Sequence, residues 1–141
     1  MGHEAEQDKV QYVVWKPEMS VGSKAIDVQH RQVISLLNEL HMGLRTPGSP
    51  LDLEAMLLKL RIFTETHFAY EETVLRLIDF PGLDRHKAMH ESMGVKTREV
   101  IADLSRSKDY AALLQFLREW WLGHIQGVDR HYAPYLVALG L

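Results

Sequence analysis

Pairs of side chains that can bind metal ions recur at helical spacing in the middle of the chain. His67 and Glu71 are four residues apart, and so are His86 and His90. In an α-helix this spacing brings two side chains onto one face, about 6 Å apart along the axis. Since imidazole and carboxylate groups are both common metal ligands, each pair predicts two ligands directed at a shared metal centre.

A third pair has a spacing that a regular helix does not accommodate. His124 and Asp129 are five residues apart, which overshoots one helical face by about 140°. Both can point inward only if the helix ends or widens there, for instance in a π-bulge, and Gly127 between them eases such a distortion. With His30, which lies among apolar residues, the predicted inward set is His30, His67, Glu71, His86, His90, His124 and Asp129.

The size of this set indicates two metal ions. A single histidine beside an apolar stripe is usually an ordinary core residue, but burying the whole set without a partner would cost several kcal/mol for each ionised group. Metal coordination compensates this burial cost for all seven side chains together. Seven ligands are too many for one zinc ion, and imidazole mixed with carboxylate suits iron. If both carboxylates and one bridging oxygen join a six-coordinate iron pair, five imidazole bonds, four carboxylate bonds and two bonds to that oxygen fill eleven of the twelve positions. One position then stays open for a small molecule such as O₂.

The elements that must position these side chains are helices, because apolar residues recur every three or four positions. This pattern predicts helices over about 25–45, 51–78 and 83–104 and from about 109 towards Pro134. Ser49, Pro50 and Asp52 are predicted to cap the start of the second helix. Short breaks between the helices favour antiparallel neighbours. The expected fold is therefore all-α, an up-down-up-down four-helix bundle.

The beginning of the chain differs from the rest. Residues 12–22 lack helical periodicity and are expected to form an ordered, non-helical N-terminal arm. Residues 1–11 are polar and are expected to be flexible. A chain of 141 residues suffices for one hydrophobic core, so we expect a single domain over residues 1–141.

Composition argues against several classes of protein. A net charge of −3 leaves no basic surface for a nucleic-acid backbone. Cysteine is absent, which excludes disulfides, thiolate-bound zinc and iron–sulfur clusters. No apolar stretch approaches the roughly 18 residues of a membrane helix, and the N-terminus has no apolar signal segment. We therefore expect a cytoplasmic protein with neither a nucleic-acid nor a membrane partner.

In the order and spacing of its motifs the chain resembles the bacterial hemerythrins, or bacteriohemerythrins, which are non-haem di-iron proteins built on a four-helix bundle. The resemblance covers about residues 15–135. It rests on Trp15, Ser20-Val21-Gly22, Ile26-Asp27, Gln29-His30, Asn38, His67-Phe68, Glu71-Glu72, Phe80-Pro81, His86, His90, Trp120, His124-Ile125 and Asp129.

The resemblance implies a ligand assignment and a function. His86, His90 and His124 would ligate one iron, and His30 and His67 the second. Glu71, Asp129 and an oxo or hydroxo group would bridge the two ions. The second iron, with fewer protein ligands, would reversibly bind O₂ or small anions. This implies a binding protein for oxygen storage, delivery or sensing rather than an enzyme.

Two other functions are compatible with the same centre. An open iron beside a second, reducing iron permits redox chemistry, so the protein could be an enzyme acting on peroxide or nitric oxide. The sequence offers no dedicated acid or base beyond the ligands, which disfavours this alternative. The third reading is an O₂- or redox-sensing module, which would need a signalling partner.

Trp121 departs from the family pattern, which usually has leucine at this position. It lies three residues before His124, so it can lean over the cofactor cavity. There the indole would narrow the path to the open iron, and its N–H could donate a hydrogen bond to a bound ligand. The alternative is that Trp120 fills the inner wall while Trp121 packs between helices.

The remaining histidines are expected to have no direct role at the metals. His41 lies too far along its helix from His30, His131 too far beyond His124, and His3 is in the polar tail. Glu72 points away from Glu71 and is predicted to orient an imidazole or to face solvent.

Overall fold

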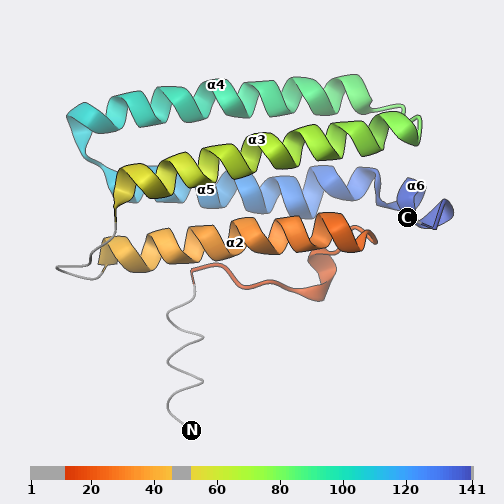
Figure 1. Ribbon diagram of the computed structural model, residues 1–141, viewed down its shortest axis with the longest axis horizontal. Coiled ribbons are helices and arrows are strands. Elements are labelled where there is room, and N and C mark those ends of the chain that lie inside the picture. Colours follow the sequence, from red (N-terminus) through yellow and green to blue (C-terminus); the bar gives the residue numbers. More distant parts are fainter. Residues whose placement is uncertain (1–11, 46–51, 141) are drawn as a thin grey trace, which may run out of the picture.

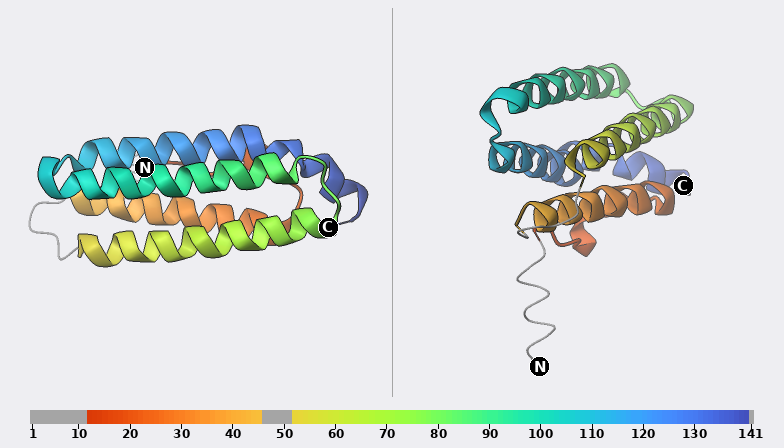
Figure 2. Two further views of the ribbon diagram at one scale, coloured as in Figure 1. Left: turned by 90° about the horizontal axis from the view of Figure 1, so that it is seen from above. Right: turned by 60° about the vertical axis from the view of Figure 1, so that its left-hand side comes forward.

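Four long helices dominate the computed structural model, which describes residues 12–45 and 52–140. The helices are α2 (Lys24–Arg45), α3 (Leu53–Leu77), α4 (Leu83–Ser107) and α5 (Tyr110–Gly123). Successive helices run in opposite directions and lie side by side (Figure 1). Two further views in Figure 2 show the same helices packed as a bundle. The predicted up-down-up-down bundle is therefore confirmed.

After α5 the chain continues through irregular helical turns. A π-helix, η2 (His124–Val128), leads into a 3₁₀ turn, η3 (Asp129–His131), and then into the short helix α6 (Ala133–Ala138). Pro134 lies in the first turn of α6, where its missing N–H has no helical partner to lose. Pro134 thus starts a new helix at the end of the bundle.

Two helix boundaries differ from those predicted. The second helix begins at Leu53 rather than Leu51, because Asp52 itself is the N-cap and accepts a hydrogen bond from the Ala55 N–H at 3.1 Å. Ser49 and Pro50 lie outside the described residues. Helix α4 continues to Ser107 and ends where Lys108 adopts a left-handed conformation, with φ 52°.

The N-terminal arm is non-helical apart from a 3₁₀ turn, η1 (Pro17–Met19), as predicted. Asn38 in α2 holds the arm through two hydrogen bonds with Val13: its Oδ1 accepts from the Val13 N–H, and its Nδ2 donates to the Val13 carbonyl, each at 2.8 Å. Val13, Met19 and Val21 are buried. The arm therefore packs against the bundle and covers apolar surface.

The core consists of two apolar clusters with a polar layer between them. On α3, Phe68 belongs to the larger cluster and Leu75 to the smaller, and Glu71 lies between them in sequence. On α2, His30 lies in the same way between Ile26 and Val33. Apolar residues therefore enclose this layer at both ends. Within the described residues, no helix combines the length and the apolarity that crossing a membrane requires.

Candidate metal centre

The polar layer contains all seven side chains that the spacing singled out. Helix α2 contributes His30, α3 contributes His67 and Glu71, and α4 contributes His86 and His90, while the last two come from the irregular turns after α5. None of the seven is more than 4% exposed. The bundle thus brings together every predicted ligand and removes each of them from solvent.

The π-helix solves the spacing problem of His124 and Asp129. In η2 the Asp129 N–H donates to the His124 carbonyl, five residues earlier. This π-helical hydrogen bond brings two side chains that are five residues apart onto one face. Asp129 Oδ1 consequently lies 2.8 Å from His124 Nε2. The distortion that the sequence predicted between these residues is confirmed.

The seven side chains form two adjoining groups, and in each group the candidate ligand atoms lie within 4.8 Å of one another. One group is Glu71, His86, His90 and His124, and the other is His30, His67, Glu71 and Asp129. In the first group two imidazole nitrogens, the Nε2 atoms of His90 and His124, approach to 3.4 Å. Nitrogens from separate helices thus converge on one small volume.

Glu71 directs its two oxygens to different groups. Its Oε1 contacts His86 Nε2 and lies 3.1 Å from His90 Nε2, both in the first group. Its Oε2 lies 3.3 Å from His67 Nε2, in the second group. A carboxylate that divides its oxygens in this way is positioned to bridge two metal ions.

Asp129 is divided in the same manner. Its Oδ1 lies 2.8 Å from His124 Nε2 and 3.2 Å from His86 Nε2. Its Oδ2 lies 2.9 Å from His30 Nε2. Two carboxylates, from α3 and from the start of η3, therefore span the same pair of imidazole groups.

Several atoms of the cluster are close together without being hydrogen-bonded. His30 Nε2, His67 Nε2 and both carboxylate oxygens of Asp129 are buried and have no hydrogen-bond partner among the described residues. Unpaired buried polar atoms are costly. Metal ions between the imidazole nitrogens and carboxylate oxygens would satisfy them, so the residues present fit a pair of metal ions with N and O ligands.

Hydrogen bonds from outside the cluster orient two of the imidazoles. His90 Nδ1 lies 2.9 Å from Glu72 Oε2, and His67 Nδ1 lies 2.6 Å from Gln29 Oε1. Because each Nδ1–H donates to an oxygen, each Nε2 keeps its lone pair for a metal ion. Of the two alternatives predicted for Glu72, the structure supports the one in which it orients an imidazole, whereas Gln29 was matched only as part of a motif.

Tyr132 is a second residue whose role the sequence analysis missed. It is fully buried, and its hydroxyl donates to Glu71 Oε2 at 3.0 Å. Its position three residues after Asp129, one turn along a helical segment, was the available signal. Tyr132 therefore holds the carboxylate that both groups share.

The electrostatics of the cluster favour added positive charge. Burial by itself lowers the pKa of His30, but the carboxylates of Asp129 and Glu71 outweigh burial and raise this pKa to about 9. The same balance raises the pKa of His86 to about 9. Burial alone would raise the pKa of Glu71, yet the surrounding imidazoles hold it well below its ordinary value. The two carboxylates therefore favour positive charge at His30 and His86, whereas burial holds the pKa of His67 below its ordinary value.

Two tryptophans, with ring centres 5.2 Å apart, lie beside the imidazoles of the centre. The indole of Trp121 is 1% exposed, and its ring centre lies 5.8 Å from that of His67. Its Nε1 is buried and has no hydrogen-bond partner in the described part of the chain. Trp120 is half-buried and stacks on His124, with 4.4 Å between ring centres.

The remaining histidines lie apart from both groups. His41 is half-buried and stacks on Tyr12, with ring centres 4.2 Å apart, and His131 is exposed. His3 lies outside the described residues.

Comparison with protein families gives an independent view of the chain. A family model described as "Hemerythrin HHE cation binding domain" matches residues 21–136. A bacteriohemerythrin of Stenotrophomonas maltophilia is 29% identical over 127 residues, covering 89% of this chain and 82% of the relative. A hemerythrin-like protein of Naegleria gruberi is 28% identical over 123 residues, covering 84% and 88%.

The fold is also similar to a solved structure. A crystal structure of a hemerythrin mutant matches with a TM-score of 0.72 and 27% sequence identity, over 89% of this chain and 98% of the other. The family model spans both candidate metal groups and all four long helices. This chain therefore belongs to the hemerythrin HHE cation-binding family.

Proposed function

We propose that the seven side chains hold two iron ions and that the protein binds O₂ reversibly at this centre. The observation that carries the proposal is the division of the Glu71 and Asp129 oxygens between two imidazole groups. A single metal ion would not require two carboxylates that each direct one oxygen to each imidazole group. The similarity to proteins named bacteriohemerythrin supports the same function.

In this proposal His86, His90 and His124 hold one iron, His30 and His67 hold the other, and both carboxylates hold the pair together with an oxo or hydroxo group. When bound, the iron pair supplies the electrons for reversible binding of O₂. The protein's part is to orient the imidazoles through Glu72 and Gln29. The enclosing apolar clusters keep bulk water away from the centre.

The surroundings of the centre support binding rather than catalysis. Tyr132, beyond the seven candidate ligands, is a buried titratable side chain that hydrogen-bonds to the cluster. Burial and the neighbouring carboxylates of Asp129 and Glu71 hold its pKa well above the ordinary value, so its hydroxyl keeps its proton. A residue poised for proton transfer would have a pKa near the working pH. For this reason we place an enzyme acting on peroxide or nitric oxide second.

The proposal is tested by metal analysis and spectroscopy of protein purified without oxygen. We expect two irons per chain and a visible spectrum that changes when O₂ is added and reverts when O₂ is removed. One metal per chain, or tightly held zinc in place of iron, would contradict the di-iron centre. An irreversible spectral change would favour a redox enzyme over a carrier.

Trp121 is expected to control how small ligands bind. Its indole lies against His67, on the side with fewer protein ligands, and its buried N–H is free to donate to a ligand there. In Trp121→Leu we expect faster association of O₂ and azide and, because a hydrogen bond is lost, dissociation about tenfold faster. Stopped-flow absorbance measures both rates.

The matched control is Trp15→Leu, because Trp15 lies in the N-terminal arm beside Arg31 and has no ring contact with the candidate ligands among the described residues. Its rates should equal those of the parent chain. Unchanged rates in Trp121→Leu would place this indole outside the ligand pocket.

A further inference from the structure

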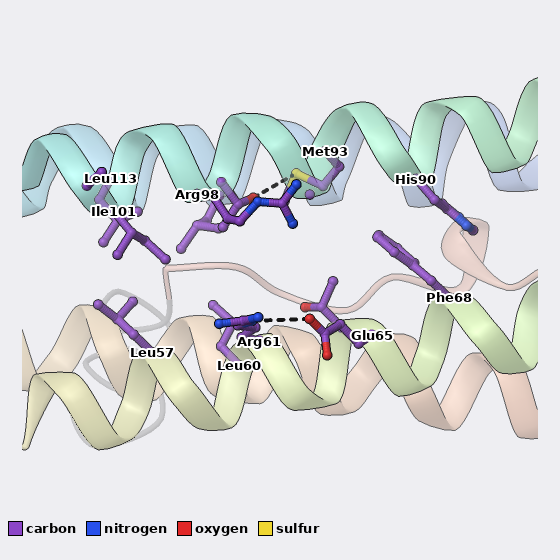
Figure 3. Close-up of a pocket in the computed structure, with 15 residues that line it drawn as sticks. Leu57, Leu60, Arg61, Glu65, Phe68, His90, Met93, Arg98, Ile101 and Leu113 are labelled. Atoms are coloured by element: carbon purple, nitrogen blue, oxygen red, sulfur yellow. Dashed lines mark hydrogen bonds and ion pairs between the residues drawn. The ribbon is translucent and has the colours of Figure 1, made fainter.

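A groove between α3 and α4 forms a cavity beside the metal centre. Its volume is about 340 Å³, within the range of small-molecule sites. Figure 3 shows its walls, with Leu57 and Leu60 on α3 facing Met93 and Ile101 on α4. Leu113 and Leu117 of α5 complete the lining. The groove is therefore predominantly apolar.

Gly94, in the middle of α4, keeps this groove open. A Cβ atom added at Gly94 would meet only the far end of one flexible side chain, Arg98 Nη1, at 3.8 Å. The space above the glycine is thus vacant rather than filled by a close neighbour. Glycine inside a helix is less stable than alanine, and no close neighbour among the described residues requires glycine at this position.

The charges of the groove are unbalanced. Arg61 and Arg98 lie on opposite walls (Figure 3), and Glu65 is the acidic residue that lines the same cavity. Glu65 is paired with Arg61 at 3.1 Å. Arg98 forms no hydrogen bond or ion pair within residues 12–45 and 52–140. One cation therefore remains available at the edge of an apolar trough.

The inner end of the groove reaches the metal centre without entering it. Phe68 and His90 both line the cavity, and their rings stack in parallel with 3.8 Å between centres. His90 directs its Nδ1 to Glu72 and its Nε2 into the cluster, so both ring nitrogens are engaged elsewhere. A molecule in the groove would touch this ring pair and leave the candidate metal ligands in place.

We infer that this groove binds a small amphiphilic anion, of which a medium-chain carboxylate is the simplest example. The alkyl chain would lie on the leucine and methionine side chains, and the carboxylate would pair with Arg98. Arginine suits a carboxylate because its guanidinium can donate two parallel hydrogen bonds. The inference uses residues other than the candidate ligand atoms, so it does not rest on which metal the centre holds.

Isothermal titration calorimetry of the full, metal-loaded chain tests the inference with octanoate, decanoate, 1-octanol and octylammonium as probes. We expect one carboxylate per chain. Each added methylene should tighten binding roughly fourfold, so decanoate should bind ~15-fold tighter than octanoate. 1-Octanol should bind more weakly than octanoate, and octylammonium more weakly still. Equal affinity for octylammonium and octanoate would overturn the inference, as would no binding of octanoate.

Variants distinguish the groove from other apolar surface. Arg98→Gln should weaken octanoate binding about tenfold and leave 1-octanol unaffected. Arg106→Gln, the same change at an exposed position of α4 outside the groove, is the control and should bind octanoate like the parent chain. If both variants bind octanoate equally, Arg98 is not the anion site.

Gly94→Leu should fill the groove and abolish binding of all the probes. Gly94→Ala, which adds a single carbon where nothing clashes, should weaken binding less. Both replacements remove a helical glycine, so thermal midpoints no lower than that of the parent chain are expected and show that the variants fold. An unchanged octanoate affinity in Gly94→Leu would place the probe elsewhere and overturn the inference.

Discussion

The Glu71→Gln variant is expected to lose metal from both positions of the centre, with iron falling from two per chain to well below one. Glu71 lies in both candidate groups, and each of its oxygens faces a different one. Glutamine has nearly the same shape, but its neutral amide replaces a negative bridging oxygen with an NH₂ donor. Metal analysis after exhaustive dialysis measures the loss.

Two matched variants make this test specific. Glu72→Gln changes the adjacent residue, which hydrogen-bonds to His90 and belongs to neither metal group, so it should weaken metal affinity about 10- to 100-fold while two metals still bind at saturation. His41→Gln lies outside both groups and should retain full metal content. If Glu71→Gln and His41→Gln load iron equally, Glu71 is not a bridging ligand.

Removal of the metal is expected to destabilise the fold by several kcal/mol. Without ions, five imidazoles and two carboxylates stay buried, and several of their atoms have no hydrogen-bond partner in the described residues. Ligand atoms that are preassembled by folding convert metal-binding free energy into folding free energy. For a chain of this size the thermal midpoint should fall by roughly 10 °C or more.

Thermal unfolding of the iron-loaded and chelator-treated protein, followed by circular dichroism, measures this difference. In Glu71→Gln the two forms should differ much less, since that variant holds little metal to remove. Equal midpoints for the loaded and metal-free parent chain would show that the cluster is stable as a set of proton-carrying imidazoles and carboxylates.

Much of the metal centre was predictable because it depends on the spacing of residues within single helices. A spacing of four places His67 with Glu71, and His86 with His90, on one helical face whatever surrounds the helix. The spacing of five between His124 and Asp129 required a distortion, and the π-helix is that distortion. The apolar repeats likewise predicted the four helices, with ends that agree to within a few residues except at α5, which ends at Gly123 and continues as the π-helix.

Other features depend on how the helices pack against one another, and the spacing of residues within one helix does not predict that packing. Which oxygen of Glu71 faces His67 and which faces His90 depends on the rotation and axial offset of the other helices around α3. The contact of Gln29 with His67 joins residues 38 positions apart, and that of Tyr132 with Glu71 joins residues 61 apart.

Gly94 is another residue whose role depends on packing. In the sequence it is a costly residue inside a predicted helix, and it lines a groove only because α3 packs opposite α4. The sequence by itself therefore determined which side chains face inward, because helical periodicity is a property of each segment. The tertiary structure decided which inward atoms meet and which gaps stay open, because those contacts join segments distant in the chain.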